Sequence, residues 1–247
     1  MAGRTYRTEA VVLRSLRLGE ADRVLHLYTL ERGRIGAVAK GIRRTRSRVG
    51  GRLEPLSHVE AMLHQGSGEL QTVTSVHLVR SHAATREHHY RLSVGLVGAE
   101  AMLRLFTEQE ASPRAFEAIT RFLDACDTLE PRPGRPALDA LALAFQLKLL
   151  WLSGYQPHTE SCAECGAAPP LAGYLPRAGG AVCRACLEPG TVGVSPRAFA
   201  AADALLHRPL ADARDLPLTE RDAREILAVI AAAYEFHGGF RLRTLSA

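Results

Sequence analysis

Lysine, aromatic residues and long apolar runs are scarce in this chain of 247 residues. Lysine occurs only at Lys40 and Lys148, so almost all of the positive charge is carried by arginine. No run reaches the roughly 18 uncharged apolar residues that a membrane helix needs, and the N-terminal sequence MAGRTYRTEA has no apolar signal core. We therefore expect a cytoplasmic protein, in which paired cysteines indicate metal or redox chemistry rather than disulfides.

Several motifs of catalysis are also missing. The sequence has no GxxxxGK[ST] phosphate-binding loop, no GxSxG nucleophile turn and no HExxH metal-binding helix. His58-Val59-Glu60 has the HxE spacing of zinc deaminases, but these enzymes pair it with PCxxC, and here Ser161 and Val182 precede the two CxxC pairs. We interpret His58 as a strand histidine and expect a protein that is not an enzyme. A zinc hydrolase or deaminase, which needs an open metal position, remains the catalytic alternative.

The excess of positive charge lies at one end of the chain. Residues 1–80 hold 14 basic and 7 acidic side chains, whereas residues 81–247 hold 17 basic and 19 acidic ones. A module that binds a polyanion has this kind of charge asymmetry.

Residues 1–80 have the pattern of a small β domain. Short apolar runs that favour strands occur at 10–13, 24–30, 35–39, 59–63 and 73–79. Residues 65–68, Gln-Gly-Ser-Gly, predict a hairpin turn between the last two runs. About five strands in this length indicate an OB-type barrel, although an SH3-like barrel gives a similar pattern.

Residues 81–247 change to the period of helices. Apolar side chains between Leu138 and Leu152 form one helical stripe in a segment that is apolar almost all round, which predicts the centre of a bundle. Ser112-Pro113, Ser195-Pro196 and Thr219 have the character of helix starts. The overall prediction is an α+β multidomain protein: an OB-type barrel at 1–80, then a helical domain at 81–247 with an insertion at about 157–192.

Four cysteines in that insertion form the most specific motif. Cys162 and Cys165, then Cys183 and Cys186, give the spacing C-x2-C-x17-C-x2-C, which is typical of zinc ribbons and fingers. Four thiolates complete a tetrahedral shell around Zn²⁺ and leave no position for water or substrate, so the predicted site is structural.

Other interpretations of the cysteines are weaker. A pair of thioredoxin-like redox motifs needs a βαβ context that is missing, and an iron–sulfur cluster, which also uses four cysteines, remains open. We interpret Cys126, in a partly apolar helical stretch, as a buried free thiol. His158 is near enough to compete as a ligand, but the four cysteines already fill the shell.

The second informative segment is a basic loop at residues 40–52. It contains six cationic side chains and no acid: Lys40, Arg43, Arg44, Arg46, Arg48 and Arg52. Many cations on a glycine-containing backbone suit the phosphates of a nucleic acid. Arg14 and Arg17, near the first strand, extend the predicted surface. The alternative is a solvated loop without a partner, but the loop lies in the net-positive part of the chain.

The barrel has few rings on which bases could stack. Residues 1–80 contain only Tyr6 and Tyr28 as aromatic side chains. Single-strand binders usually stack bases on aromatic rings, so we expect binding that is mainly electrostatic, sensitive to salt and weakly selective for sequence.

These features together resemble the RecO family of bacterial DNA recombination and repair mediators. The resemblance covers essentially the whole chain and is carried by ordered runs: EAVVL at 9–13, GEADR at 19–23, RGR at 32–34, AVAKG at 37–41, GGRLEP at 50–55, LSGYQP at 152–157 and the two cysteine pairs.

The resemblance implies an OB fold, a helical bundle and an embedded zinc-ribbon-like element. It also implies binding of single- and double-stranded DNA, annealing of complementary strands, and work with RecR, and usually with single-strand binding protein, to load RecA. Carried onto this sequence, it makes Lys40, Arg43, Arg44, Arg46 and Arg48 the leading DNA contacts, followed by Arg14, Arg17 and Arg52. It implies a nucleoid-associated location. An RNA-binding or ribosome-associated zinc-ribbon protein is the alternative function.

Overall fold

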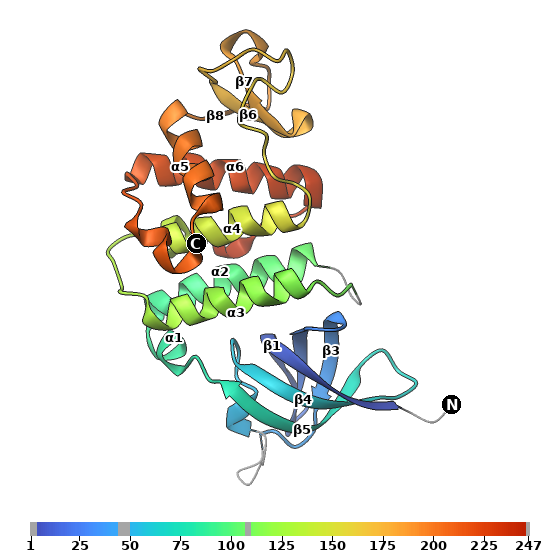
Figure 1. Cartoon of the computed structure of the whole chain (residues 1–247). Coiled ribbons are helices and arrows are strands. Elements are labelled where there is room, and N and C mark those ends of the chain that lie inside the picture. Colours follow the sequence, from blue (N-terminus) through green and yellow to red (C-terminus); the bar gives the residue numbers. More distant parts are fainter. Residues whose placement is uncertain (1–3, 44–49, 107–109, 246–247) are drawn as a thin grey trace. The chain divides into compact units, whose positions relative to one another are not determined.

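The computed structural model of the protein describes residues 4–43, 50–106 and 110–245 (Figure 1). Contacts divide the chain into two compact units, Met1–Thr128 and Leu129–Ala247. The last barrel strand ends at Arg80, where the sequence pattern changes from strands to helices. The compact units divide later, after Thr128, because three helices that follow the barrel pack with it.

Five strands of the first unit close into a barrel in the order β1-β2-β3-β5-β4. They are β1 (Arg4–Leu18), β2 (Asp22–Thr29), β3 (Gly33–Ala39), β4 (His58–Gln65) and β5 (Gln71–Arg80). All neighbouring strands run antiparallel except β3 and β5, and the long β1 pairs with both β2 and β4. This five-stranded closed order confirms the OB-type prediction.

Alternating apolar side chains fill the barrel. In β3, Ile35, Ala37 and Ala39 are buried, whereas Arg34, Gly36 and Val38 between them are half-buried. The same alternation in β2 contributes Leu25 and Leu27 to the core. Burial on one face is what the short predicted apolar runs provide, since side chains of a strand point alternately to its two faces.

One extra residue, Leu13, interrupts the regular pairing of β1 with β2. The register shifts between Val12 and Arg14. Side chains alternate between the two faces along a strand, so one extra residue changes which positions face outwards. Even-numbered positions face the core before Leu13 and face outwards after it. Beyond Leu13, three exposed side chains of β1 share the outer face: Arg14, Leu16 and Leu18.

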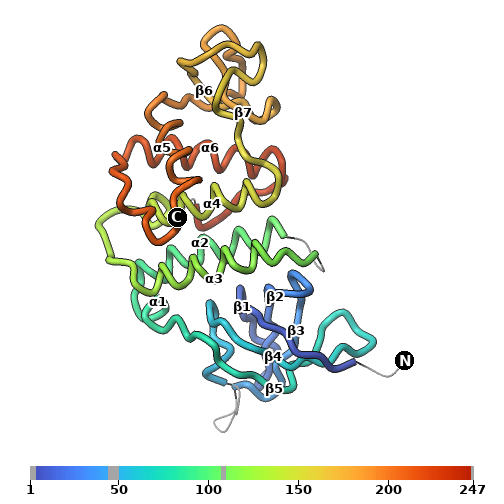
Figure 2. The backbone as a smooth tube through the Cα atoms, viewed as in Figure 1, coloured from blue at the N-terminus to red at the C-terminus, as the bar shows by residue number. Residues whose placement is uncertain are grey.

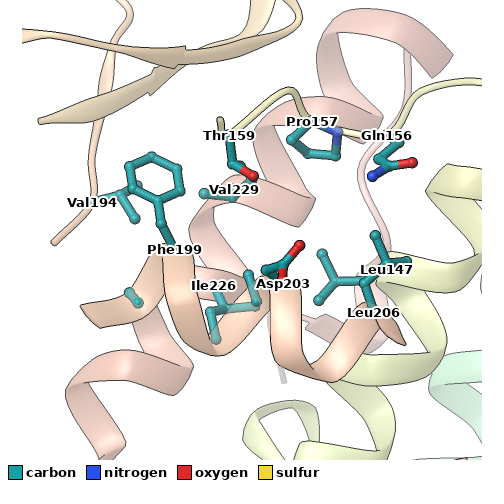
Figure 3. Close-up of a pocket in the computed structure, with 12 residues that line it drawn as sticks. Leu147, Gln156, Pro157, Thr159, Val194, Phe199, Asp203, Leu206, Ile226 and Val229 are labelled. Carbon is teal, nitrogen blue, oxygen red and sulfur yellow. The ribbon is translucent and has the colours of Figure 1, made fainter. Parts of the chain in front are cut away.

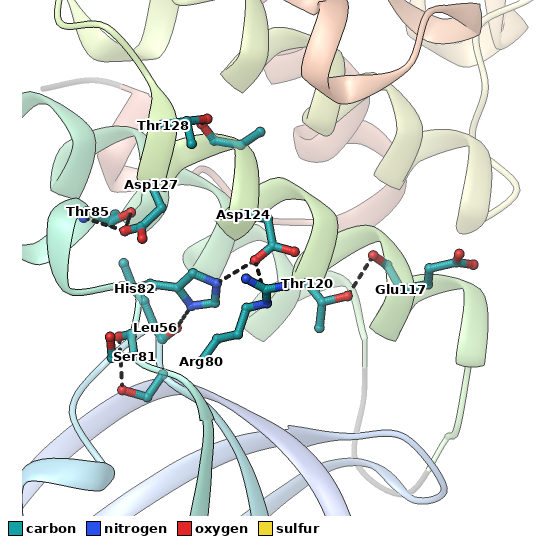
Figure 4. Close-up of polar contacts among 12 residues, drawn as sticks. Leu56, Arg80, Ser81, His82, Thr85, Glu117, Thr120, Asp124, Asp127 and Thr128 are labelled. Carbon is teal, nitrogen blue, oxygen red and sulfur yellow. Dashed lines mark hydrogen bonds and ion pairs between the residues drawn. The ribbon is translucent and has the colours of Figure 1, made fainter.

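Helices α1 (Ala83–Glu87), α2 (His89–Leu105) and α3 (Pro113–Thr128) complete the first unit. His82 joins them to the barrel, since its Nδ1 lies 2.8 Å from the carbonyl oxygen of Leu56 and its Nε2 lies 3.1 Å from Asp124 Oδ1 (Figure 4). Thr85 donates from its backbone N–H and its hydroxyl to Asp127 in α3. These buried polar contacts explain why α1 to α3 belong to the compact unit of the barrel.

The second unit contains helices α4 (Ala140–Leu152), α5 (Pro196–His207) and α6 (Glu220–Gly238). Most side chains of α4 are buried, as predicted for the centre of a bundle. Between α4 and α5 the chain forms a small sheet of order β7-β6-β8 and then returns to the helices, as Figure 2 traces. Its strands are β6 (Gly173–Leu175), β7 (Gly180–Val182) and β8 (Val192–Gly193).

The predicted helix starts are confirmed by capping bonds. Ser112 and Ser195 accept a hydrogen bond from the backbone N–H of Ala115 and Ala198 respectively. Thr219 and Asp222 form a reciprocal capping box at the start of α6. Among the helices of the described residues, none is long and apolar enough to cross a membrane.

Candidate metal centre and nucleic-acid interface

The four predicted metal ligands come together in the second unit. The Sγ atoms of Cys162, Cys165, Cys183 and Cys186 all lie within 4.8 Å of one another, and those of Cys165 and Cys183 are 3.8 Å apart. Sulfurs about 2.3 Å from one Zn²⁺ in a tetrahedral shell are about 3.8 Å from each other. The cluster therefore has the ligand type, the number and the spacing that hold a metal ion of this kind.

Two tight turns position these sulfurs. In the first, Gly166 has φ +73° and its N–H donates to the carbonyl oxygen of Cys162, which folds the chain back directly after Cys165. A left-handed φ favours glycine at this position. The second turn is a 3-10 helix, Arg184–Cys186, that follows β7. The β6–β7 hairpin brings the two turns together, so the element is built around the cluster.

Hydrogen bonds lower the pKa of one thiol in the cluster, whereas neighbouring sulfurs raise the pKa of another. The backbone N–H of Cys183 donates to Cys162 Sγ over 3.3 Å and lowers the pKa of Cys162 to about 6. The sulfur of Cys165 raises the pKa of Cys186 to about 12. Thiolates this close repel one another, so a bound cation is what allows all four to ionise together.

Arg177 ties both turns together beside the cluster. Its Nε and Nη2 donate to the two carboxylate oxygens of Glu188, over 2.5 and 2.7 Å, and its Nη1 lies 3.0 Å from Glu164 Oε1. Glu164 lies in the first turn and Glu188 follows the second. A bidentate arginine–carboxylate pair fixes orientation as well as charge, so Arg177 holds the two halves of the element in register.

The cluster has as many thiols as a tetrahedral shell has positions. Four cysteines complete a tetrahedral shell without His158, whose Nε2 lies 2.9 Å from Ser161 Oγ. Cys126 is buried in α3 of the first unit, which confirms its predicted burial. His58 and Glu60 also belong to the first unit, where they lie close to Glu9 and Arg7 respectively. These contacts support the interpretation of the HxE pattern as part of a strand.

A pocket in the second unit offers no catalytic set. Figure 3 shows its lining, in which Asp203 is the one ionisable side chain among mainly apolar groups such as Leu147, Phe199 and Ile226. His207, one turn further along α5, lies 3.3 Å from Asp203. The lining residues include no nucleophile that is paired with a base.

The barrel brings several predicted DNA contacts to one region. Arg17 pairs with Arg23 of β2, and Arg23 pairs with Ala39 of β3, which directly precedes Lys40. The backbone N–H of Gly41 donates to Asp22 Oδ1 over 2.7 Å, so the segment after β3 is held against the β1–β2 turn. Arg17 and Lys40 therefore lie at the same end of the barrel, at the ends of β1 and β3.

The remaining predicted contacts occupy different places. Arg14 is exposed on β1, before Arg17. Arg43 donates to the carbonyl oxygen of Glu20, and Arg52 donates to that of Val76 over 3.3 Å, so both guanidinium groups are anchored by backbone. Three predicted contacts lie outside the described residues: Arg44, Arg46 and Arg48.

Most of these cations are exposed and without an acidic partner. In the described part of the chain, no carboxylate lies within ion-pair distance of Arg14, Arg17 or Lys40. Neighbouring Arg23 does have such a partner, Glu54, at 3.7 Å. Unpaired cations can exchange their counterions for phosphates without first losing an internal ion pair.

The two tyrosines of the barrel are engaged within the fold. Tyr28 is fully buried, and burial raises its pKa to about 12. Tyr6 is half-buried, donates to Gln71 Oε1 over 2.6 Å, and has the guanidinium of Arg32 3.7 Å from its ring centroid. Neither ring is presented as an open platform for a base.

The sequence pattern does not reveal the arginine that supports the cysteine cluster. Arg177 has no recognisable signal in the sequence, because its partners Glu164 and Glu188 become its neighbours only once the hairpin forms. Gly166 does have a readable signal, since a glycine directly after the second cysteine of a pair permits the tight turn.

Two family models together match nearly all of the chain. The model described as Recombination protein O N terminal matches residues 1–82, and that described as Recombination protein O C terminal matches residues 86–246.

Curated relatives named DNA repair protein RecO are similar over most of their length. The relative from Thermobifida fusca is 38% identical over 94% of this chain and 93% of its own. That from Nocardioides sp. is 37% identical over 94% of both chains. That from Rubrobacter xylanophilus is 40% identical over 76% of this chain and 78% of its own.

Proposed function

Since this chain belongs to the recombination protein O (RecO) family, we propose that it acts in DNA repair and recombination by binding single- and double-stranded DNA and annealing complementary strands. The observation that supports this proposal is the group of exposed cations without an acidic partner in the described part of the barrel: Arg14 and Arg17 in β1 and Lys40 directly after β3. Lys40 and Arg43 are its leading described contacts, with Arg14, Arg17 and Arg52 around them. Arg44, Arg46 and Arg48 extend the proposed contact set.

The proposed mechanism needs no bond to break. Two DNA strands repel each other because their phosphates are negative, and a cationic surface that neutralises phosphates on both lowers this repulsion and raises the local concentration of each strand. The protein would therefore act as a mediator rather than an enzyme, and it would need no nucleotide cofactor. We further propose that it works with RecR and single-strand binding protein to help load RecA.

We propose Zn²⁺ as the ion that the four cysteines hold. Thiolates favour zinc among the common divalent ions, and a shell of four leaves no site for substrate. The ion would hold the two turns of the element together and so contribute to the stability of the second unit.

Strand annealing tests the proposed function most directly. Purified protein is mixed with complementary oligonucleotides, one of them carrying a quenched fluorophore, without ATP and over a series of salt concentrations. We expect annealing to accelerate at low salt and to slow as salt rises, since added ions compete for phosphates. No acceleration at low salt would contradict the proposal. Competition with RNA of the same sequence separates it from the RNA-binding alternative, for which RNA would displace DNA.

A further inference from the structure

Five aliphatic side chains gather on the outer face of the barrel near the proposed DNA contacts. We call them the aliphatic patch: Leu16, Leu18, Val24, Val38 and Leu70. Three of these are among the more exposed large apolar side chains of the protein, since Leu16, Leu18 and Leu70 are 39%, 43% and 44% exposed. Leucine in such a position is costly unless something covers it, because apolar surface is better removed from water.

Strand pairing places the first members of the patch in one row. Leu16 pairs with Val24, and Val24 pairs with Val38, so these three side chains lie side by side across β1, β2 and β3. They point outwards because the barrel core is formed by the alternate residues, such as Leu25 and Ala37.

A glycine brings the loop between β4 and β5 onto the same face. A β-carbon at Gly36 would lie only 2.6 Å from Leu70 Cδ2, so the leucine side chain rests directly on the β3 backbone. Gly36 is the outward-facing neighbour of Val38 along β3. Leu70 therefore extends the row of Leu16, Val24 and Val38 to one side.

Cations border this patch on both sides. Arg14 pairs with His26, which pairs with Gly36, so Arg14 lies one position beyond the Leu16 row. Lys40 follows on the opposite side, two residues after Val38. Asp22, an acidic side chain that pairs across from Leu18, accepts the N–H of Gly41.

We propose that the aliphatic patch contacts the faces of unpaired bases in single-stranded DNA, while the bordering cations hold the phosphates. The flat face of a base is apolar and can lie on leucine and valine side chains as it lies on an aromatic ring. In a duplex the base faces are stacked inside, so only a single strand can use the patch. This inference rests on the proposed DNA binding and adds to it a contact that salt does not weaken.

The surroundings favour a nucleic acid over a protein segment as the occupant. A protein segment would meet a surface bordered by Arg14 and Lys40 on a unit whose residues 1–128 hold 19 basic and 14 acidic side chains. A DNA strand provides both matching halves in each nucleotide, one phosphate and one base face. The barrel tyrosines, Tyr6 and Tyr28, do not offer an open ring for the base.

The double substitution Leu16→Ser and Leu70→Ser tests the patch. Binding of a fluorescent single strand and of a duplex of the same sequence is measured across a salt series. We expect the single-strand affinity to fall about tenfold at every salt concentration, because base contacts of this kind contribute little through charge. The slope of log affinity against log salt stays unchanged, and the duplex affinity stays within about twofold.

A matched control uses two exposed leucines outside the patch. Leu96 and Leu187 are 37% and 46% exposed, and replacing both by serine should leave both affinities unchanged. Circular dichroism and thermal unfolding confirm that each variant is folded. An equal loss for single strand and duplex, or no loss for either, would overturn the inference while leaving the proposed DNA binding intact. Wild-type protein that binds neither DNA would instead overturn the proposed function.

Gly36→Ala supplies an independent variant. Its added methyl group displaces the end of Leu70 from β3 without changing charge or removing any apolar side chain. We expect a smaller loss, about threefold, that again affects the single strand alone. A variant that keeps its single-strand affinity but changes its oligomeric state would show that a second protein copy, rather than DNA, uses the patch.

Discussion

The basic end of the barrel and the cysteine element use charge in opposite ways. At the barrel, Arg14, Arg17 and Lys40 are exposed and have no acidic partner in the described part of the chain. In the cysteine element, Arg177 is fully occupied by Glu164 and Glu188. The comparison teaches that internally paired charges serve the fold, whereas cations left unpaired are available to a ligand. Four changes test this contrast.

Removing two ligands from the cysteine element should have the largest effect. In a Cys162→Ser, Cys183→Ser variant, one ligand is lost from each turn, and we expect complete loss of bound metal and unfolding of the second unit at a lower temperature. Elemental analysis and thermal unfolding measure both results. Cys126→Ala is the matched control, since Cys126 is a buried thiol in the first unit and its loss should leave metal content unchanged. A metal-free variant with unchanged unfolding would contradict a structural role.

Removing charge from the basic end should abolish much of the DNA affinity and leave the fold intact. We expect a Lys40→Ala, Arg43→Ala, Arg44→Ala variant to bind DNA about 10- to 100-fold more weakly, with a salt slope lower by about 2 to 3. Fluorescence anisotropy over a salt series measures both quantities.

The control for charge removes three arginines of the second unit. Replacing Arg132, Arg184 and Arg208 by alanine lowers net charge equally but should change DNA affinity only slightly. Equal losses in both variants would show that total charge, rather than the cations of the barrel, determines binding. Unchanged affinity of the first variant at physiological salt would refute the assigned contacts.

Arg177→Gln should weaken the metal centre without touching a ligand. The substitution keeps a polar side chain but breaks the bidentate contact with Glu188 and the contact with Glu164. We expect about tenfold weaker metal affinity, in the range seen when groups that orient ligands are removed. Competition with a coloured chelator measures it. Arg184→Gln, which alters an exposed arginine within the second turn, should retain normal affinity.

The smallest effect concerns a paired charge in the helices. Hydrogen bonds from Thr219, then the nearby Arg197, hold the pKa of Asp222 below its usual range despite the burial of this side chain. A lowered folded-state pKa stabilises the protein above the unfolded-state value, and this stabilisation is lost as pH falls through the folded-state pKa. We expect Asp222→Asn to lower the free energy of unfolding by about 1 kcal/mol at neutral pH. The free energy of unfolding of this variant should also fall less steeply as the pH becomes acidic.

Urea unfolding from neutral to acidic pH measures this change. Glu220→Gln serves as its control, because Glu220 is an exposed residue in the same helical turn and pairs only at the surface with Arg224. Its substitution should change stability by less than about 0.5 kcal/mol. If both variants lose the same stability, the helix dipole rather than the capping box accounts for the effect.

Local patterns predicted the elements, whereas contacts between distant segments could not be read from them. The strand runs, the proline-marked helix starts and the cysteine spacing each depend on residues close in sequence, and each is confirmed. The contact between Arg177 and Glu188 depends on how the β6–β7 hairpin folds, and that between Leu70 and Gly36 depends on barrel register. Neither register nor hairpin geometry is written in composition or periodicity.

The extra residue Leu13 divides strand β1 into two parts in which opposite sets of positions face the core. Before it, even-numbered positions such as Ala10 and Val12 face the interior, and after it the even-numbered positions face solvent. Deletion of this single leucine would leave Arg14, Leu16 and Leu18 on the outer face, because Arg14 would then directly follow Val12, just as their partners His26 and Leu27 are adjacent in β2. The bulge thus absorbs one residue without changing the surface beyond it, so the length of β1 can vary at this point while the outer face keeps its chemistry.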